Sequence, residues 1–328
     1  MSDIDPIELV RASIRLWPKQ FAQAATAAKA IKLPVRPARI ILVGMGGSAV
    51  GARVLLPVIK VTLTIPFEIV SDYAIPLSDP KNTVLIASSY SGTTEEVLTA
   101  TRTAHQRKIP IIVLTSGGTL ATWAKRMHHP LIQFDTQFNP SHQPRLGIGY
   151  SLGALTTLLT RWKLIEGFRL QVLGFRPKRT EIDAVAKKLA RKTVIIIGAG
   201  HLTGVAHLGA RYLNETAKQF AVAFEIPEVN HHLLEGLQIP KLRGQTAALF
   251  LEGTYQNKKH ARRMELTRQL FLRKGIAICT LKIRARDEWT EMWCASEMVA
   301  ELSATLAERY GVDPTRIPDV ETFKRLLK

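Results

Sequence analysis

Short apolar runs, each ending at a glycine-rich or polar loop and followed by a helical stretch, recur along the entire chain. The runs in the first half are residues 39–43, 67–70, 83–87, 110–114 and 130–134. Those in the second half are residues 193–197, 220–225, 246–251 and 276–283. Strands of this length that alternate with helices are typical of βαβ units, so we predict an α/β fold with doubly wound parallel sheets.

The same plan is used twice, which predicts two domains of similar architecture. A length of 328 residues leaves room for two hydrophobic cores. Residues 163–190 mix charge, glycine and proline in the manner of a linker, so we expect an N-terminal domain over residues 1–163 and a C-terminal domain over residues 164–328. From Trp289 onward the pattern predicts one long helix, a turn and a short terminal helix.

The composition is that of an ordinary globular protein, with 46% hydrophobic and 22% charged residues. No apolar run reaches the roughly 18–20 residues that span a bilayer. The first residues also lack the basic and apolar regions of a secretory signal, so we expect a cytoplasmic protein with no membrane partner. Of the two cysteines, Cys279 and Cys294, the first lies in an apolar run and predicts a buried thiol, and nothing indicates a disulfide framework or a metal site.

The net charge of +18 is divided evenly between the two halves of the chain. Residues 1–164 hold 18 Lys and Arg against 9 Asp and Glu, and residues 165–328 hold 27 against 18. A protein that binds nucleic acid more often gathers its charge on one face or arm, so this division argues against such a partner. An anionic small molecule such as a sugar phosphate fits a basic protein.

The sequence GMGGSAVG, residues 44–51, directly follows a predicted strand and opens a predicted helix. Glycines allow backbone N–H groups to turn toward an anion, and a helix start adds unpaired donors. The backbone of Gly46 and Gly47 and the side chain of Ser48 are therefore candidate ligand groups. The loop matches a dinucleotide fingerprint only loosely, and Asp72 lies just past the next strand, so a nicotinamide site stays as the second interpretation.

The sequence SSYSGTTEE, residues 88–96, places four candidate hydroxyls at the end of the third predicted strand: Ser89, Ser91, Thr93 and Thr94. Hydroxyls and helix-start amides bind a phosphate monoester well, since each donates to an acceptor oxygen. One such hydroxyl would be explained as a helix cap, and Ser91 or Thr93 could serve as one. Four hydroxyls, and a third loop of this kind at residues 115–120, instead predict one ligand cradle at the carboxyl ends of the strands.

These loops, in order and spacing, resemble the sugar-isomerase (SIS) domain of the bifunctional phosphoglucose/phosphomannose isomerases. The resemblance continues along most of the chain. Its further segments are SDYAIP (71–76), QPRLGIGYSLGAL (143–155), LNETAK (213–218), PEVNHHLLEG (227–236) and GVDPTRIPDVETFKRLLK (311–328). The resemblance implies two SIS-type, flavodoxin-like domains, an aldose–ketose isomerase of glucose 6-phosphate and mannose 6-phosphate, and a homodimer with no cofactor and no metal.

The resemblance also implies a role for individual residues. The residues that hold the phosphate would be Ser48, Ser89, Ser91 and Thr94. Glu215 would be the base, Arg145 would face the enediolate, and His231 would open the sugar ring in the neighbouring subunit's site. Thr315 and Lys324 would contact the sugar.

The reaction needs these kinds of groups. An imidazole titrates in the range that suits ring opening, and one carboxylate can carry the proton between C2 and C1. A permanently charged arginine suits the enediolate oxygen. The alternatives stay open, however: Glu215 has basic neighbours at salt-bridge spacing, His231 could cap a helix, Arg145 could be a surface loop residue, and Lys324 could be a solvated helix end.

Four positions depart from the family pattern: Thr93, Thr119, His232 and Leu233. They leave the proposed acid, base and arginine in place but keep a second function open, that of a non-catalytic sensor of a phosphosugar. Such regulators usually carry a helix-turn-helix domain, for which the residues before Ile40 offer little room. A third interpretation, the isomerase part of an amidotransferase, would need a glutaminase domain with a catalytic cysteine.

Overall fold

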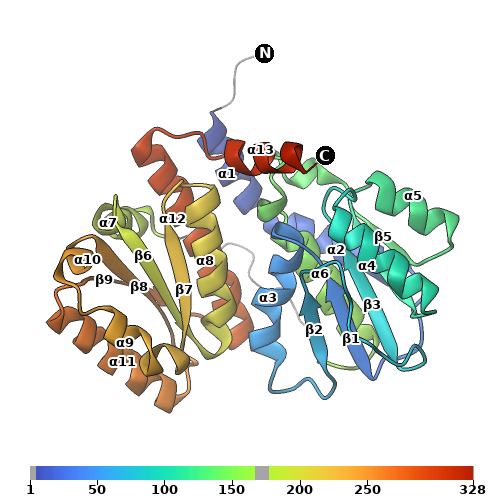
Figure 1. Ribbon diagram of the computed structural model, residues 1–328, viewed down its shortest axis with the longest axis horizontal. Helices are drawn as coiled ribbons and strands as arrows, with labels where there is room; N and C mark the ends of the chain where they lie inside the picture. Colours follow the sequence, from blue (N-terminus) through green and yellow to red (C-terminus); the bar gives the residue numbers. More distant parts are fainter. Residues whose placement is uncertain (1–4, 167–176, 328) are drawn as a thin grey trace. The chain divides into compact units, whose positions relative to one another are not determined.

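Parallel strands form two separate sheets in the computed structural model, which describes residues 5–166 and 177–327 (Figure 1). The chain divides into two compact units. The first unit is Arg15–Leu173, and the second unit joins Met1–Ile14 to Gly174–Lys328. The proposed division of the chain after residue 163 stays a prediction, because residues 167–176 lie outside the described part.

The first unit contains a sheet of five parallel strands in the order β2-β1-β3-β4-β5. These strands are β1 (Arg39–Val43), β2 (Phe67–Val70), β3 (Thr83–Ser88), β4 (Ile111–Thr115) and β5 (Leu131–Gln133). Its helices are α2 (Trp17–Ala30), α3 (Gly47–Ile59), α4 (Glu95–Gln106), α5 (Gly118–Arg126) and α6 (Ile148–Arg161), with short 3₁₀ turns η1 (Thr136–Phe138) and η2 (Pro144–Leu146). The predicted doubly wound parallel sheet is confirmed.

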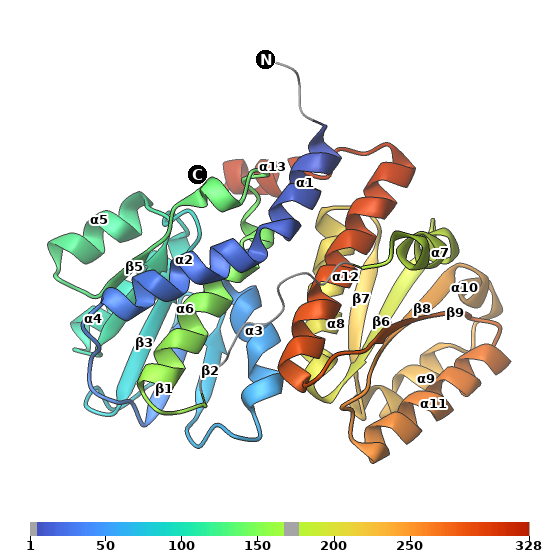
Figure 2. The same ribbon diagram turned by 180° about the vertical axis from the view of Figure 1, so that it is seen from behind.

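Helices cover both faces of this sheet. The residues of β1, β3 and β4 that point to one face pack with α4 and α5 in a single apolar cluster that includes Ile41, Leu85, Val97 and Leu120. Helices α2 and α6 pack closely against each other over the opposite face (Figure 2). Strands buried on both faces explain the nearly continuous apolar runs in the sequence.

The second unit repeats this plan with four parallel strands in the order β7-β6-β8-β9. They are β6 (Thr193–Ala199), β7 (Ala221–Ile226), β8 (Thr246–Gly253) and β9 (Ala277–Ile283). Helix α12 (Glu288–Tyr310) contacts α7 (Arg179–Leu189), η3 (Gly200–Leu202) and α8 (Thr203–Glu215). The remaining elements are η4 (Glu228–His231), α9 (Leu233–Gly236), α10 (Pro240–Gly244), α11 (Lys258–Arg273) and α13 (Pro318–Leu326).

Helix α1 (Pro6–Arg15) joins the second unit through α12. Arg11 donates to Glu301 and to Glu308, each at 2.7 Å. The predicted long helix and short terminal helix after Trp289 are confirmed as α12 and α13. No helix within residues 5–166 and 177–327 is long and apolar enough to cross a bilayer.

Both cysteines are buried and free, which confirms the predicted burial of Cys279. Burial raises the pKa of the Cys279 thiol, and burial together with neighbouring carboxylates raises the pKa of Cys294 to about 12. A thiol with a raised pKa is a poor nucleophile at neutral pH. These cysteines therefore serve as small apolar side chains in the core.

Candidate active site

Three loops meet at the carboxyl edge of the first sheet, following β1, β3 and β4. The loop after β1 leads into α3 through Gly46, and the loop after β3 leads into α4 through Thr94. The loop after β4 leads into α5 through Gly117. Parallel strands bring their carboxyl ends to one edge, so the three predicted ligand loops are neighbours in the folded unit.

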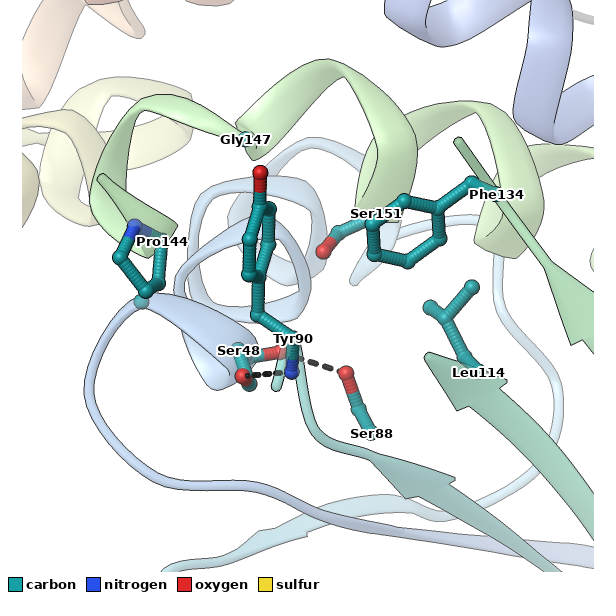
Figure 3. Close-up of a pocket in the computed structure, with 9 residues that line it drawn as sticks. Ser48, Ser88, Tyr90, Leu114, Phe134, Pro144, Gly147 and Ser151 are labelled. Atoms are coloured by element: carbon teal, nitrogen blue, oxygen red, sulfur yellow. Dashed lines mark hydrogen bonds between the residues drawn. The ribbon is translucent and has the colours of Figure 1, made fainter. Parts of the chain in front are cut away.

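Ser48 joins the first loop to the second by two hydrogen bonds. Its Oγ accepts from the backbone N–H of Tyr90 at 2.8 Å, and its carbonyl oxygen accepts from Ser88 Oγ at 2.8 Å (Figure 3). A serine hydroxyl that accepts one bond still has its own proton to donate. The first turn of α3 is therefore fixed against the hydroxyl-rich loop, with Ser48 Oγ at the junction.

The hydroxyls of the second loop bond to one another in pairs. Ser89 Oγ lies 2.9 Å from Thr94 Oγ1, and Ser91 Oγ lies 2.9 Å from Thr93 Oγ1. The backbone N–H of Gly92 donates to Ser89 Oγ at 3.1 Å. Ser91 and Thr93 are exposed, whereas Ser89 is buried. The loop thus presents one exposed and one covered hydroxyl pair.

The interpretation of Ser91 or Thr93 as a helix cap is wrong. Helix α4 begins at Glu95 with Thr94 in the capping position, and the Thr94 side chain makes no capping hydrogen bond. Its hydroxyl instead bonds to Ser89. The backbone donors of this helix start therefore lack the usual side-chain cap, which is the condition for binding an anion there.

Two glycines allow the second and third loops to touch. Gly92 and Gly118 both have left-handed backbone, with φ of 70° and 68°. A Cβ on Gly92 would overlap the carbonyl oxygen of Gly117, and one on Gly118 would overlap the carbonyl oxygen of Ser91. Only glycine combines this conformation with this approach, so both positions are needed for the loop packing.

Tyr90 connects all the loops at this edge. Its carbonyl oxygen accepts from the N–H of Ser116 at 3.1 Å and from Ser116 Oγ at 2.7 Å. Its phenol oxygen accepts from Asn139 Nδ2 at 2.8 Å, and its ring is so close to Gly147 that a Cβ there would lie 2.6 Å from Cε2. Burial raises the pKa of Tyr90, a rise that the hydrogen bond from Asn139 opposes.

Arg145 lies in η2, beside the first glycine loop. A Cβ added to Gly47 would lie 2.8 Å from the backbone nitrogen of Arg145, so Gly47 is needed for this close approach. The Arg145 side chain is 3% exposed, and its Nη1 donates to Gln143 Oε1 at 2.8 Å. The interpretation of Arg145 as a surface loop residue is therefore wrong.

A cavity of about 10 Å³ lies beneath these loops (Figure 3). Its lining residues include Ser48, Ser88, Tyr90 and Gly147. A volume of this size holds about one water molecule. A sugar phosphate does not fit inside it, and the exposed side chains of Ser91 and Thr93 are not among its lining residues.

The other predicted residues belong to the second unit. Glu215 is the last residue of α8 and is half-buried. Lys218 Nζ donates to the carbonyl oxygen of Glu215 at 2.7 Å and to that of Arg316 at 2.6 Å. This lysine, for which the sequence indicated only a salt-bridge spacing, holds the end of α8 beside the turn that contains Thr315.

Thr315 is used within its own turn. Its N–H and its hydroxyl donate to Asp313 Oδ1 at 2.8 and 2.6 Å. Burial favours a higher pKa for Asp313, but the hydrogen bonds from Thr315 and from the Arg316 backbone outweigh it and hold the pKa below its usual value. The Thr315 hydroxyl therefore stabilises the Asp313 carboxylate.

His231 and Lys324 are both exposed. His231 ends the short turn η4, just after the cis peptide bond between Ile226 and Pro227. Lys324 lies on α13, a helix that buries none of its residues. The adjacent His232 lies against the Phe224 ring, with ring centroids 5.7 Å apart.

The carboxyl edge of the second sheet holds a buried histidine–carboxylate hydrogen bond that the sequence did not indicate. His201 Nε2 lies 2.7 Å from Glu291 Oε2, and these side chains are 2% and 0% exposed. Glu291 also accepts from the backbone N–H groups of Thr254 and Tyr255, which follow β8. Positions 201 and 291 are far apart in sequence, so only the fold brings them together.

No group of three His, Cys, Asp or Glu side chains that could hold a metal ion occurs among residues 5–166 and 177–327. The residues missed by sequence reasoning are Ser88, Tyr90, Asn139 and Gln143. Ser88 and Tyr90 stand within the hydroxyl-rich segment, which was the available signal. Asn139 lies in an irregular segment without a pattern, whereas Gln143 opens the segment at residues 143–155 that carries the resemblance.

Two family models match most of the chain. The SIS domain matches residues 35–133, and the bacterial phospho-glucose isomerase C-terminal SIS domain matches residues 178–327. A bifunctional phosphoglucose/phosphomannose isomerase of Caldicellulosiruptor bescii is 29% identical over 337 residues, which cover 96% of this chain and 98% of that protein. Another, from Thermoplasma volcanium, is 26% identical and covers 88% of this chain and 90% of its own length.

Solved structures share the fold. The C-terminal domain of glucosamine-fructose-6-phosphate aminotransferase from Francisella tularensis matches with a TM-score of 0.74, covering 94% of this chain and 98% of that one. The sequence identity in this match is 14%, so it bears on the fold alone.

Proposed function

This chain belongs to the family of bifunctional phosphoglucose/phosphomannose isomerases, and we propose that it interconverts glucose 6-phosphate and mannose 6-phosphate with fructose 6-phosphate. The reaction is an aldose–ketose isomerisation through a cis-enediol. The relatives named above favour an enzyme over a non-catalytic sensor. The homodimer and the cytoplasmic location stay predictions.

The substrate's phosphate would bind to the three loops of the first unit. Ser48, Ser89, Ser91 and Thr94 would donate hydroxyl protons, and the uncapped start of α4 would add backbone donors. The backbone of Gly46 and Gly47 would approach the sugar. The observation that carries this proposal is the packing of these donor-rich loops at one sheet edge, held together by Ser48 and Tyr90.

Each chemical step would use one of the residues that the resemblance indicates. Glu215 would take the proton from C2 and return it to C1, while the Arg145 guanidinium would stabilise the negative charge on the enediolate oxygen. His231 would protonate the ring oxygen during opening. Thr315 and Lys324 would bind sugar hydroxyls. These assignments rest on the family resemblance of the segments that contain them.

A coupled assay of fructose 6-phosphate formation tests the activity, and the Glu215→Gln variant tests the base. We expect kcat to fall by about 10²–10⁴ in this variant, because a neutral amide carries no proton between carbons. Binding of a phosphorylated sugar acid, an enediolate mimic, should change little in calorimetry. Glu235→Gln, an exposed carboxylate of the same unit, is the control.

The outcomes of this experiment are separable. Absence of turnover by the wild-type protein at high concentration would overturn the isomerase, and saturable sugar-phosphate binding without turnover would favour the sensor. Full activity of Glu215→Gln would instead leave the isomerase standing and show that another group is the base.

Mixing two inactive variants tests whether His231 acts in the neighbouring subunit. One is His231→Ala, and the other carries Ser89→Ala with Thr94→Ala. If His231 acts across a two-fold dimer, random exchange of subunits restores one intact site in each mixed dimer, or about a quarter of the wild-type activity. No recovery after verified subunit exchange would place His231 in its own chain's site.

A further inference from the structure

The positive charge of the chain is concentrated in one short segment. Residues 254–286 contain ten Lys and Arg but a single acid, Glu265, which gives a net charge of +9. This tenth of the chain carries half of the total charge of +18. The net charge is equal in the two halves of the sequence, but within the second half it is concentrated in this segment. A comparison of the two halves is therefore too coarse to exclude a polyanionic partner.

These residues belong to one supersecondary unit at the border of the second sheet. They lie on the loop after β8, on α11, on the edge strand β9 and on the loop that follows β9. Helix α11 buries Met264, Thr267 and Phe271 against the sheet. At helical spacing, Lys258, Arg262 and Arg273 lie on the opposite, exposed face.

Basic side chains from the two ends of this unit gather at the carboxyl edge of the sheet. Helix α11 starts there with Lys258 and Lys259, and β9, which runs parallel to β8, ends there after Lys282. Tyr255 ties the two loops together, because its phenol donates to the carbonyl oxygen of Arg286. The Tyr255 side chain is nevertheless 44% exposed.

Carboxylates neutralise little of this charge. Arg268 pairs with Glu252 and Glu265, and Arg286 pairs with Asp287. The other eight basic residues of this segment form no ion pair within residues 5–166 and 177–327. They are Lys258, Lys259, Arg262, Arg263, Arg273, Lys274, Lys282 and Arg284. Seven of these eight are exposed and Lys274 is half-buried. Their mutual repulsion would be relieved by a partner with many negative charges.

We propose that these basic residues and Tyr255, here called the basic surface, bind single-stranded nucleic acid. Lys258, Lys259, Arg262 and Lys282 would contact successive backbone phosphates, and a base would stack on the exposed Tyr255 ring. A groove of positive charge with an aromatic platform is how proteins hold single strands without reading sequence.

The arrangement favours nucleic acid over an anionic membrane. A helix that lies in a bilayer surface needs its apolar face outward, whereas α11 turns that face to the core. Its exposed leucines, Leu266, Leu270 and Leu272, do not share one side of the helix, because Leu272 is half a turn from Leu270. They therefore offer no continuous surface for lipid.

Fluorescence anisotropy with a labelled 20-nucleotide single strand tests this proposal. The triple variant Lys258→Gln, Lys259→Gln, Arg262→Gln should bind about tenfold more weakly at 0.1 M salt, and the slope of log affinity against log salt should fall by about 2. A matched control removes three exposed lysines of the first unit by Lys29→Gln, Lys60→Gln and Lys81→Gln. We expect both variants to keep isomerase activity and melting temperature, because all six side chains are exposed.

Tyr255→Ala distinguishes stacking from charge. We expect about tenfold weaker binding of the single strand with an unchanged salt slope, and weaker binding of a duplex than of the single strand. Equal losses in the two triple variants would overturn the proposal, since the binding would then reflect net charge alone. Binding to vesicles with 30% anionic lipid but not to the oligonucleotide would overturn it in favour of a membrane.

Discussion

The two sheets share one strand order but differ at their carboxyl edges. The order β2-β1-β3-β4 in the first unit corresponds to β7-β6-β8-β9 in the second. A tyrosine follows the central strand by two residues in each, Tyr90 after β3 and Tyr255 after β8. The amide of Tyr90 donates to a serine hydroxyl, whereas the amide of Tyr255 donates to the buried carboxylate of Glu291.

The two carboxyl edges differ in what the backbone donors of their loops bind. In the first unit, glycine turns and hydroxyls leave donors at the loops for an external anion. In the second, α12 brings Glu291 onto the loop amides, and the Glu291 side chain also hydrogen-bonds to His201. The second edge thus holds an anion that belongs to the chain. A phosphate would have to displace it, so the two edges are not equivalent ligand sites.

Removing the internal carboxylate should have the largest effect. Glu291→Ala leaves the buried His201 and two part-buried backbone donors without their partner, and we expect the free energy of unfolding to fall by about 3–5 kcal/mol, since each unsatisfied group costs about 1–3 kcal/mol. Urea denaturation measures this. Glu288→Ala is the control, because Glu288 is exposed and 3.9 Å from His201.

A small anion should partly replace the lost side chain. Formate or acetate at high concentration should raise the melting temperature of Glu291→Ala by several degrees more than that of the wild type, since it would refill the site. An equal response of both proteins would mean that the amides do not form an anion site, and the comparison of the two edges would fail.

Adding a methyl group to the first edge should break the phosphate loops. Gly92→Ala forces an overlap with Gly117 and a disfavoured left-handed alanine. We expect kcat/KM to fall by about 100-fold, because a displacement of about 1 Å in a binding site costs that much. Steady-state kinetics of fructose 6-phosphate formation measures it.

The third loop supplies the control for this change. Gly117 has an extended φ of 169°, and a Cβ there would meet nothing within 4 Å. Gly117→Ala should therefore be close to wild type. If both variants lost activity equally, the general presence of glycine, and not the contact at Gly92, would be what the loops require.

The two tyrosines offer a smaller, matched comparison. Tyr90→Phe removes one of the two acceptors of the buried Asn139 amide, the other being the carbonyl oxygen of Gln143. This should cost about 1 kcal/mol and lower kcat/KM about fivefold through the loop that carries Arg145. Tyr255→Phe should leave the isomerase unchanged. Phenylalanine keeps the size of the tyrosine ring, so a loss of activity and stability in Tyr90→Phe would come from the missing hydrogen bond and not from packing. Equal kinetics of the two variants would contradict a role for Tyr90.

The sequence patterns predicted most of the fold because strand burial and loop chemistry are local properties. The strands among the described residues follow from apolar runs such as residues 83–87, and the ligand loops follow from glycines and hydroxyls at their ends. The contacts between loops could not be predicted from the sequence. Asn139 with Tyr90, and His201 with Glu291, are pairs separated by 49 and 90 residues, and no local pattern encodes such contacts.

The smallest expected effect concerns Thr315, whose hydroxyl bonds to Asp313. Because that carboxylate has a lowered pKa when folded, it stabilises the protein above the unfolded pKa of about 4, and this contribution is lost as the pH falls through the lower folded pKa. Thr315→Val should reduce stability by about 0.5–1 kcal/mol at pH 7, with a difference that narrows between pH 5 and 3. Urea titrations across this range measure it.

The same variant separates a structural from a substrate-binding role at this position. If Thr315 serves only its turn, Thr315→Val changes stability with pH as described and leaves KM for the sugar phosphate unchanged. If its hydroxyl also binds the sugar, KM rises at pH 7, where the loss of stability is too small to unfold the protein. Thr315→Ser, which keeps the hydroxyl, should restore both properties, because the bond to Asp313 needs the oxygen and not the methyl group.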